Sequence, residues 1–304
     1  MTRAIPILSG ILAMLVAGCA SSEVPYTRVS VPITAPRKIE PAASFHSHLI
    51  DESSGIAKST RYEGVYWTHN DSGDRARIFP VTLQGETVAM GDGLGIPVKL
   101  AQSRDWEDIA SDHKGNLLIG DFGNNANMRE DLCVYIVPEP NPIDANQAIV
   151  KRAIPFYFPE QKSFPPAEAN FDVEAIFVAN DTWYVLTKHR ADADTCLYRF
   201  DSYREDKPNA LTLVCRFGAR GMVTAADALP DGSRVAVLSY DNVWVFEPPE
   251  GDIDRLPEGK VYWRPYRLGQ CEAICFIDRD TLLVTNEQGK LFVIPITDLI
   301  EVQQ

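Results

Sequence analysis

Residues 174–187, EAIFVANDTWYVLT, consist of two apolar runs joined by a polar turn, a pattern typical of two antiparallel strands. Residues 272–285, EAICFIDRDTLLVT, repeat this pattern over the same length. Three more segments align with them and begin at Ser54, Glu107 and Thr224, which gives five copies at intervals of 53, 67, 50 and 48 residues. Periods of this size indicate an array of similar structural units.

Each copy contains enough further sequence for two more strands. A third strand is expected after a polar loop, at residues 77–83, 133–138, 196–200, 243–246 and 291–296. A fourth is expected at residues 96–100, 153–158, 211–217 and 261–268. Four strands in about fifty residues is the size of one propeller blade. We therefore predict an all-β, five-bladed β-propeller, with six blades if the 67-residue interval hides a degenerate blade, and a β-sandwich as the non-propeller alternative.

The last copy lacks a fourth strand, which raises the question of how the ring closes. Residues 27–33, TRVSVPI, form an otherwise unassigned strand-like run near the start of the chain. We expect this N-terminal strand to pair with the last copy and close the ring, because closure removes exposed sheet edges.

Composition narrows the class of protein. The chain has 304 residues, of which 45% are apolar and 23% charged, and this excludes a disordered or collagen-like protein. Its formal net charge of −13 repels nucleic acid phosphates, so a general nucleic acid binder is not expected.

The N-terminus has the features of an export signal. Arg3 precedes an apolar run at residues 4–17 that is too short to span a bilayer. The run ends in LVAGC at residues 15–19, which resembles a bacterial lipobox and implies a lipid on Cys19. We therefore expect a signal peptide at 1–18, a lipid-anchored tether at 19–25 and one propeller domain at 26–304, the alternative being an ordinary signal peptide. By analogy with lipoproteins, Ala20 in place of Asp implies the outer membrane, facing the periplasm.

Five cysteines remain after Cys19. Cys196 and Cys215 lie in successive predicted strands around a polar turn, where antiparallel pairing would set them nearly opposite, so we predict a disulfide between them. Cys271 and Cys275 are four residues apart in one predicted strand, about 13 Å from each other, which is too far for a disulfide.

Propeller geometry places the first residue of all five copies on one face, around the central channel. These residues are oxygen-bearing in every copy: Ser54, Glu107, Glu174, Thr224 and Glu272. Three converging carboxylates repel one another unless they take up protons or a cation compensates them. Calcium, which prefers oxygen ligands, is the expected ion. The alternative is that each glutamate bonds to the backbone of a neighbouring blade.

The order Ser, Glu, Glu, hydroxyl, Glu resembles the calcium-activated nucleotidase (soluble apyrase) family. The local matches are ESSGI at 52–56, DWE at 105–107, VEA at 173–175 and CEAI at 271–274. The resemblance implies a five-bladed propeller with one central calcium. Thr224 stands where the family has serine, and the family's arginine-rich stretch and DDRTG loop are reduced to KHR at 188–190 and NDSG at 70–73. A looser resemblance is to six-bladed calcium lactonases and esterase-like phytase domains.

The loops on the same face offer reactive groups. Asp71 and Asp121 are candidates to position or deprotonate a water, while Asn70, Lys188 and Arg190 are candidates to hold a small anionic or ester ligand. Two function classes follow. One is a metal-dependent hydrolase of phosphoesters or esters, and the alternative is a non-catalytic propeller that binds a ligand or an envelope protein.

Overall fold

The computed structural model describes residues 26–88 and 94–302. The predicted signal peptide, the tether and Cys19 lie outside the described residues.

Antiparallel pairing groups most of the described strands into sets of four, which we number as units 1 to 5 along the chain. Units 2 and 3 belong to one nine-stranded sheet, because β11 also pairs in parallel with β15. Unit 1 contains β3 (Ser53–Lys58), β4 (Tyr66–Asn70), β5 (Arg77–Val81) and β6 (Ile96–Lys99). Unit 2 contains β7 (Trp106–Ser111), β8 (Asn116–Asp121), β9 (Cys133–Pro138) and β11 (Arg152–Tyr157). Unit 3 contains β12 (Asp172–Ala179), β13 (Thr182–Lys188), β14 (Thr195–Phe200) and β15 (Asn209–Phe217). Unit 4 contains β16 (Val223–Ala228), β17 (Val235–Ser239), β18 (Asn242–Glu247) and β19 (Lys260–Pro265). Unit 5 contains β20 (Cys271–Asp278), β21 (Thr281–Asn286), β22 (Lys290–Pro295) and β2 (Ala43–Ser44).

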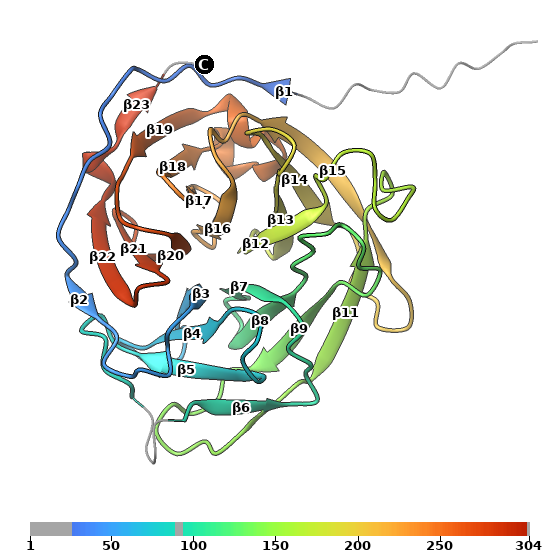
Figure 1. The fold of residues 1–304 in the computed structure, drawn as a ribbon, viewed down its shortest axis with the longest axis vertical. Helices are drawn as coiled ribbons and strands as arrows, with labels where there is room; N and C mark the ends of the chain where they lie inside the picture. Colours follow the sequence, from blue (N-terminus) through green and yellow to red (C-terminus); the bar gives the residue numbers. More distant parts are fainter. Residues whose placement is uncertain (1–25, 89–93, 303–304) are drawn as a thin grey trace, which may run out of the picture.

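The units surround a common axis (Figure 1). Their first strands, β3, β7, β12, β16 and β20, each pack against the next one along the chain, and β20 packs against β3. The inner strands therefore form a closed ring, with the later strands of each unit farther out. This arrangement is a β-propeller.

Short strands extend the outer edges of units 1 and 4. β10 (Ala148–Ile149) pairs with β6, and β23 (Ile300–Val302) adds a strand to unit 4. The 67-residue interval between Glu107 and Glu174 thus holds unit 2, β10 and irregular loops. The helices of the described chain are three short 3-10 segments, Pro249–Gly251, Ile253–Glu258 and Ile296–Asp298, and none has the length and apolar character needed to cross a membrane.

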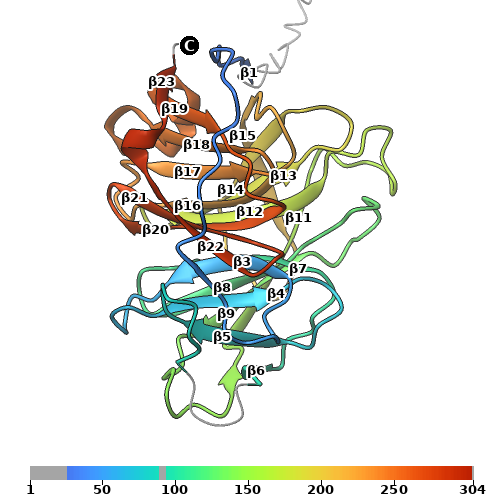
Figure 2. The same cartoon turned by 60° about the vertical axis from the view of Figure 1, so that its left-hand side comes forward.

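The N-terminal segment does pair with the last unit, but residues 27–33 do not form the pairing strand. β1 (Tyr26–Thr27) lies parallel to β15, and residue 37 makes an isolated bridge to Tyr266. The partner of β22 is β2 instead, through Ala43 with Leu291. Figure 2 shows this segment running along the outside of the sheets between β1 and β2. We call residues 26–44 the N-terminal strap.

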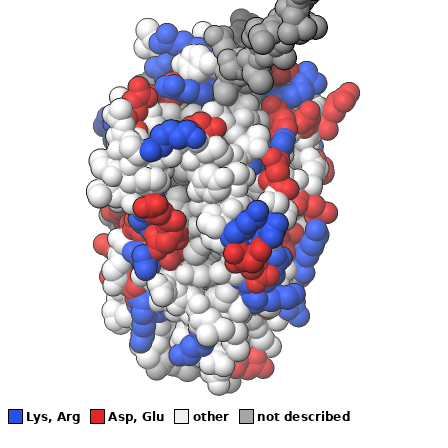
Figure 3. All heavy atoms as spheres, turned by 90° about the vertical axis from the view of Figure 1, so that its right-hand side faces the viewer, with Lys and Arg blue, Asp and Glu red and all other residues white. Residues whose placement is uncertain are grey.

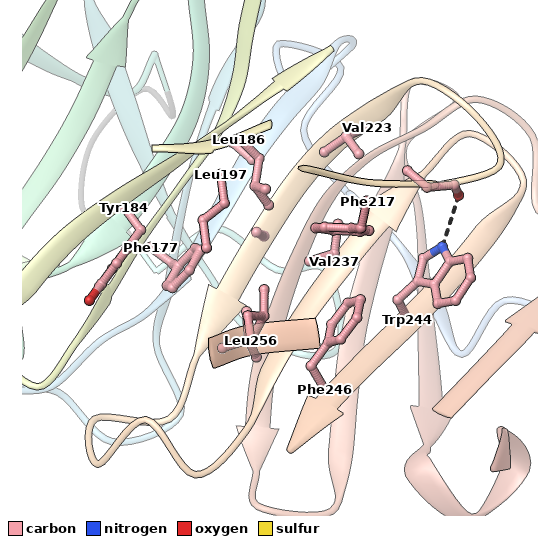
Figure 4. Close-up of a cluster of buried hydrophobic side chains, with 14 of the residues drawn as sticks. Phe177, Tyr184, Leu186, Leu197, Phe217, Val223, Val237, Trp244, Phe246 and Leu256 are labelled. Carbon is pink, nitrogen blue, oxygen red and sulfur yellow. Dashed lines mark hydrogen bonds between the residues drawn. The ribbon is translucent and has the colours of Figure 1, made fainter. Parts of the chain in front are cut away.

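Five apolar clusters lie between neighbouring units, because each unit packs one face against the unit before it and the other face against the unit after it. Figure 4 shows the cluster between units 3 and 4, where Phe177 and Leu197 meet Phe217, Trp244 and Phe246. Trp244 is fully buried, and its indole nitrogen donates to the carbonyl of residue 219 (3.0 Å). Replacing a tryptophan of this kind with alanine costs about 3 to 5 kcal/mol, so these clusters are the main stabilising element of the ring.

The predicted disulfide is wrong, because the register differs by one residue. Cys196 lies opposite Arg216, and Cys215 lies opposite Leu197. Successive side chains on a strand point to opposite faces, so Cys215 enters the cluster between units 3 and 4 while Cys196 enters the one between units 2 and 3. All five described cysteines are free thiols. Cys271 and Cys275 do share one strand, β20, as expected.

Candidate functional site

The five residues predicted to surround the channel share one backbone feature. In every unit the pairing of the first strand with the second is interrupted by a register shift at the predicted residue. A bulge of this kind leaves one residue unpaired and redirects its side chain. The five residues are Ser54, Glu107, Glu174, Thr224 and Glu272, and each is buried. We call them the bulge ring.

The closest group of acidic side chains forms around Glu107. Its carboxylate oxygens lie within 4.8 Å of those of Asp71 and Asp105, and no other triad of possible metal ligands this close occurs in the described part of the chain. Gly123 passes directly beside this group, since a Cβ atom there would lie 2.1 Å from Glu107 Oε1 and 2.6 Å from Asp105 Oδ2. Only glycine leaves room for the two carboxylates. Glu174 and Glu272 are not members of this close group.

Glu174 is held by cationic side chains from its own unit. Lys188 Nζ donates to Glu174 Oε2 (2.9 Å), and both side chains are almost completely buried. Arg190 pairs with Asp172 (2.8 Å) and lies 3.7 Å from Glu174. The Lys188 ammonium also lies 5.0 Å from the ring centre of Tyr240. Lys188 therefore already neutralises one carboxylate of the bulge ring.

Two more bulge-ring residues, Thr224 and Glu272, make hydrogen bonds near the start of β20. The Thr224 hydroxyl donates to the carbonyl of Cys271 (2.9 Å), which leaves its lone pairs available. Gln270 Nε2 donates to Glu272 Oε1 (3.0 Å) and to Glu287 (2.5 Å). Two carboxylates thus share one amide donor.

Burial and mutual repulsion disfavour the charged form of these acids. Burial raises the pKa of Glu107 well above its ordinary value, and Glu174, Asp71 and Asp105 raise it further. Burial also raises the pKa of Glu272 to about 7. Burial alone would lower the pKa of Lys188, but the carboxylates of Glu174 and Glu272 reverse this and raise it. Near neutral pH the site therefore favours the uptake of positive charge, either protons or a cation.

The candidate catalytic and ligand-holding residues differ in burial and in their bonding partners. Asp121 is buried in an ion pair with Arg129 (3.0 Å) and accepts a bond from the Asp105 backbone N–H. Asn70 Nδ2 donates to the carbonyl of residue 49 (2.7 Å) and to Asp74 (2.9 Å). Both residues therefore have structural partners. Asp71 and Arg190 are partly exposed and lie at the acidic group and beside Glu174, respectively.

Asp108, the residue after Glu107, joins several inner strands. Asp108, fully buried, accepts hydrogen bonds from the N–H groups of Ile109 (2.8 Å), Ile176 (2.9 Å) and Ala226 (3.4 Å). The carboxylate thus links the first strands of units 2, 3 and 4.

Sequence reasoning assigned no role to Asp105 or Gly123 and did not pair Lys188 with Glu174. Asp105 precedes Glu107 by two residues, and such residues share a face of an extended chain, so this signal was present. Gly123 depends on how the loop after β8 folds back over β7, and no local pattern specifies that.

Away from the mouth, charges of both signs are mixed. On the face shown in Figure 3, acidic and basic side chains form small clusters beside an uncharged band. Several arginines of the described chain form ion pairs, as Arg152 does with Glu205 (2.6 Å). This face has no broad field of one sign.

No family model matches the chain, and no curated protein matches it. Many solved structures are similar in fold. One is "Crystal Structure of Mitotic Checkpoint Complex", at 12% identity and a TM-score of 0.38, covering 79% of this chain and only 63% of the other. Another is "Crystal structure of Myceliophteria_thermophila Cps50 (Swd1) beta-propeller domain", at 11% identity and a TM-score of 0.43, covering 80% of this chain and 83% of the other.

Proposed function

We propose that the protein is a five-bladed, non-catalytic binding propeller whose channel mouth holds a calcium ion and takes a small anionic ligand. The bulge ring carries this proposal. Each of five interrupted strand pairings has a buried oxygen-bearing side chain at the same position of the repeat, and structural hydrogen bonding alone does not require such a residue at every bulge.

The donor set fits a hard divalent cation. All candidate ligands are carboxylate or hydroxyl oxygens, which calcium prefers. Asp71, Asp105 and Glu107 already lie close together, and Gly123 leaves space beside them. Glu174 and Glu272 would complete the shell from the other side, with Ser54 and Thr224 as hydroxyl ligands. A bound calcium would supply positive charge for an anion, and Arg190 at the rim would orient that anion.

Binding is favoured over hydrolysis because other charged groups at the mouth already have ion-pair partners. Asp121 is tied to Arg129, and Lys188 to Glu174. Of the residues considered as general bases, only Asp71 is both partly exposed and adjacent to the proposed ion. We therefore place the hydrolase second to a binding role. Lipid anchoring through Cys19 in the bacterial envelope and an envelope protein as partner remain parts of the proposal.

Calorimetric titration with calcium tests the site. Glu107→Gln should weaken calcium affinity by more than about tenfold, because losing even a residue that only supports a metal ligand costs about that much. Glu52→Gln is the matched control, because Glu52 is exposed and lies outside the bulge ring. Absence of calcium binding to the wild type, or equal behaviour of the two variants, would overturn the calcium site. Calcium-dependent hydrolysis of a nucleoside diphosphate, lost in Glu107→Gln, would overturn the non-catalytic assignment.

A further inference from the structure

A second cavity lies at the opposite end of the axis. The bulge ring lies near the starts of the first strands, whereas this cavity is lined by residues at their ends: Lys58 of β3, Ser111 of β7, Ala228 of β16 and Asp278 of β20. Its volume is about 320 Å³, which is within the range of small-molecule sites. We call it the far-mouth pocket. No residue of the bulge ring or of the acidic group around Glu107 lines this pocket, so the two sites are separate.

The body of the pocket is mostly apolar. Leu229 and Pro230 come from the loop after β16, and Phe276 and Ile277 from the end of β20. The two strands are tied together here, since Asp227 Oδ2 accepts from the Phe276 backbone N–H (2.8 Å). The walls are thus fixed by cross-unit hydrogen bonding, and they suit an apolar ligand body.

The charged residues that line the pocket differ in their hydrogen-bond and ion-pair partners. Asp227 accepts from the backbone of Phe276, and Asp278 accepts from the backbone N–H of Asp280 (2.9 Å). Arg279 lies 3.8 Å from Asp231. Lys58 Nζ donates to the carbonyl of Ile277 (2.5 Å), and no carboxylate of residues 26–88 or 94–302 forms an ion pair with it. Among the described residues, Lys58 is therefore the one lysine or arginine of the lining without a direct ion pair, although the buried Asp227 carboxyl lies near enough to interact with it electrostatically.

We propose that the far-mouth pocket binds a small amphiphilic carboxylate, with its apolar body against Phe276 and Ile277 and its carboxylate on Lys58. Lys58 bridges from unit 1 to unit 5 through the Ile277 carbonyl, so its ammonium group is fixed over the pocket. Two of its three N–H donors remain for the ligand. An anion supplies the missing counter-charge, while the apolar walls reject a fully hydrated inorganic ion.

The test uses octanoate as the probe and isothermal titration calorimetry on the full chain. Octanoate should bind saturably, and Lys58→Met should weaken it about tenfold, the value of one charge-assisted hydrogen bond. Octanamide, the uncharged analogue, should bind the wild type and Lys58→Met equally. Lys99→Met is the matched control, since Lys99 is an exposed strand lysine away from the pocket.

A second variant fills the space without touching the charge. Thr60 is exposed and lines the pocket, so Thr60→Trp should keep the fold and abolish binding of both probes. The proposal is overturned if wild-type protein shows no saturable octanoate binding at millimolar concentration. It is also overturned if Lys58→Met binds octanoate as Lys99→Met does, or if Thr60→Trp leaves the affinity unchanged.

Discussion

Replacing Lys188 with methionine tests the electrostatics of the channel mouth directly. The Lys188 and Glu174 side chains are 6% and 3% exposed, and their ion pair spans 2.9 Å. Removing one partner of a buried pair leaves an uncompensated charge and costs about 3 to 5 kcal/mol. In calcium-free buffer, Lys188→Met should therefore lower the free energy of unfolding by this amount. Urea denaturation followed by circular dichroism measures it.

Two controls separate the buried charge from other effects of the substitution. Lys114→Met removes an ion pair between Lys114 and Asp181, whose side chains are 62% and 70% exposed, and should leave the free energy of unfolding almost unchanged because solvent screens exposed pairs. The double variant with Glu174→Gln should recover much of the loss, because no unpaired charge remains at that position. Saturating calcium should also stabilise Lys188→Met more than the wild type. A calcium-free loss no larger than that of Lys114→Met would refute the reasoning.

Three further predictions concern positions near the axis. Gly123→Ala should weaken calcium binding and destabilise the protein, whereas Gly218→Ala, where a Cβ meets its nearest atom at 3.6 Å, should be almost neutral in thermal melts; equal melting temperatures would contradict the close packing. Asp108→Ala should cost about 1 to 3 kcal/mol for each backbone N–H group left without a partner, measured by urea denaturation, and a neutral outcome would show that the carboxylate does not link the units. Burial raises the pKa of Asp227 to about 7, so its contribution to stability is complete below the ordinary aspartate pKa and is lost as the pH rises toward 7 and above; Asp227→Asn should flatten this pH dependence, and an unchanged profile between pH 4 and 8 would argue against a buried titrating carboxyl group.

The repeat pattern predicted the bulge ring because each first strand has nearly the same length and ends in a short turn. Glu174 and Glu272 therefore occupy equivalent bulges even though 98 residues separate them. The bulges themselves were not predicted, since an unpaired residue leaves no mark on the apolar alternation around it.

Features that depend on strand register or on loop conformation were not predicted from the sequence. A shift of one residue separated Cys196 from Cys215, because alternation along a strand places a misregistered side chain on the wrong face. The pairing strand of unit 5 was misplaced because β2 is only two residues long and has no periodic signal. The pairing of Lys188 with Glu174 depends on the register of β12 with β13 and on the bulge at Glu174, and the position of Gly123 depends on loop folding. Short-range patterns encode neither.

The N-terminal strap also affects the order in which the chain can fold. Ala43 pairs with Leu291, so an early residue must wait for one of the last to be synthesised before unit 5 is complete. Contacts between residues so distant in sequence form slowly, because a long loop must close first. Until then the edge of β22 is open to other chains. A circular permutant with its new termini between β2 and β3, and with β23 joined by a linker to the strap, would make this contact local. It should refold faster than the natural order with the same final structure. Equal refolding rates would show that ring closure does not limit folding.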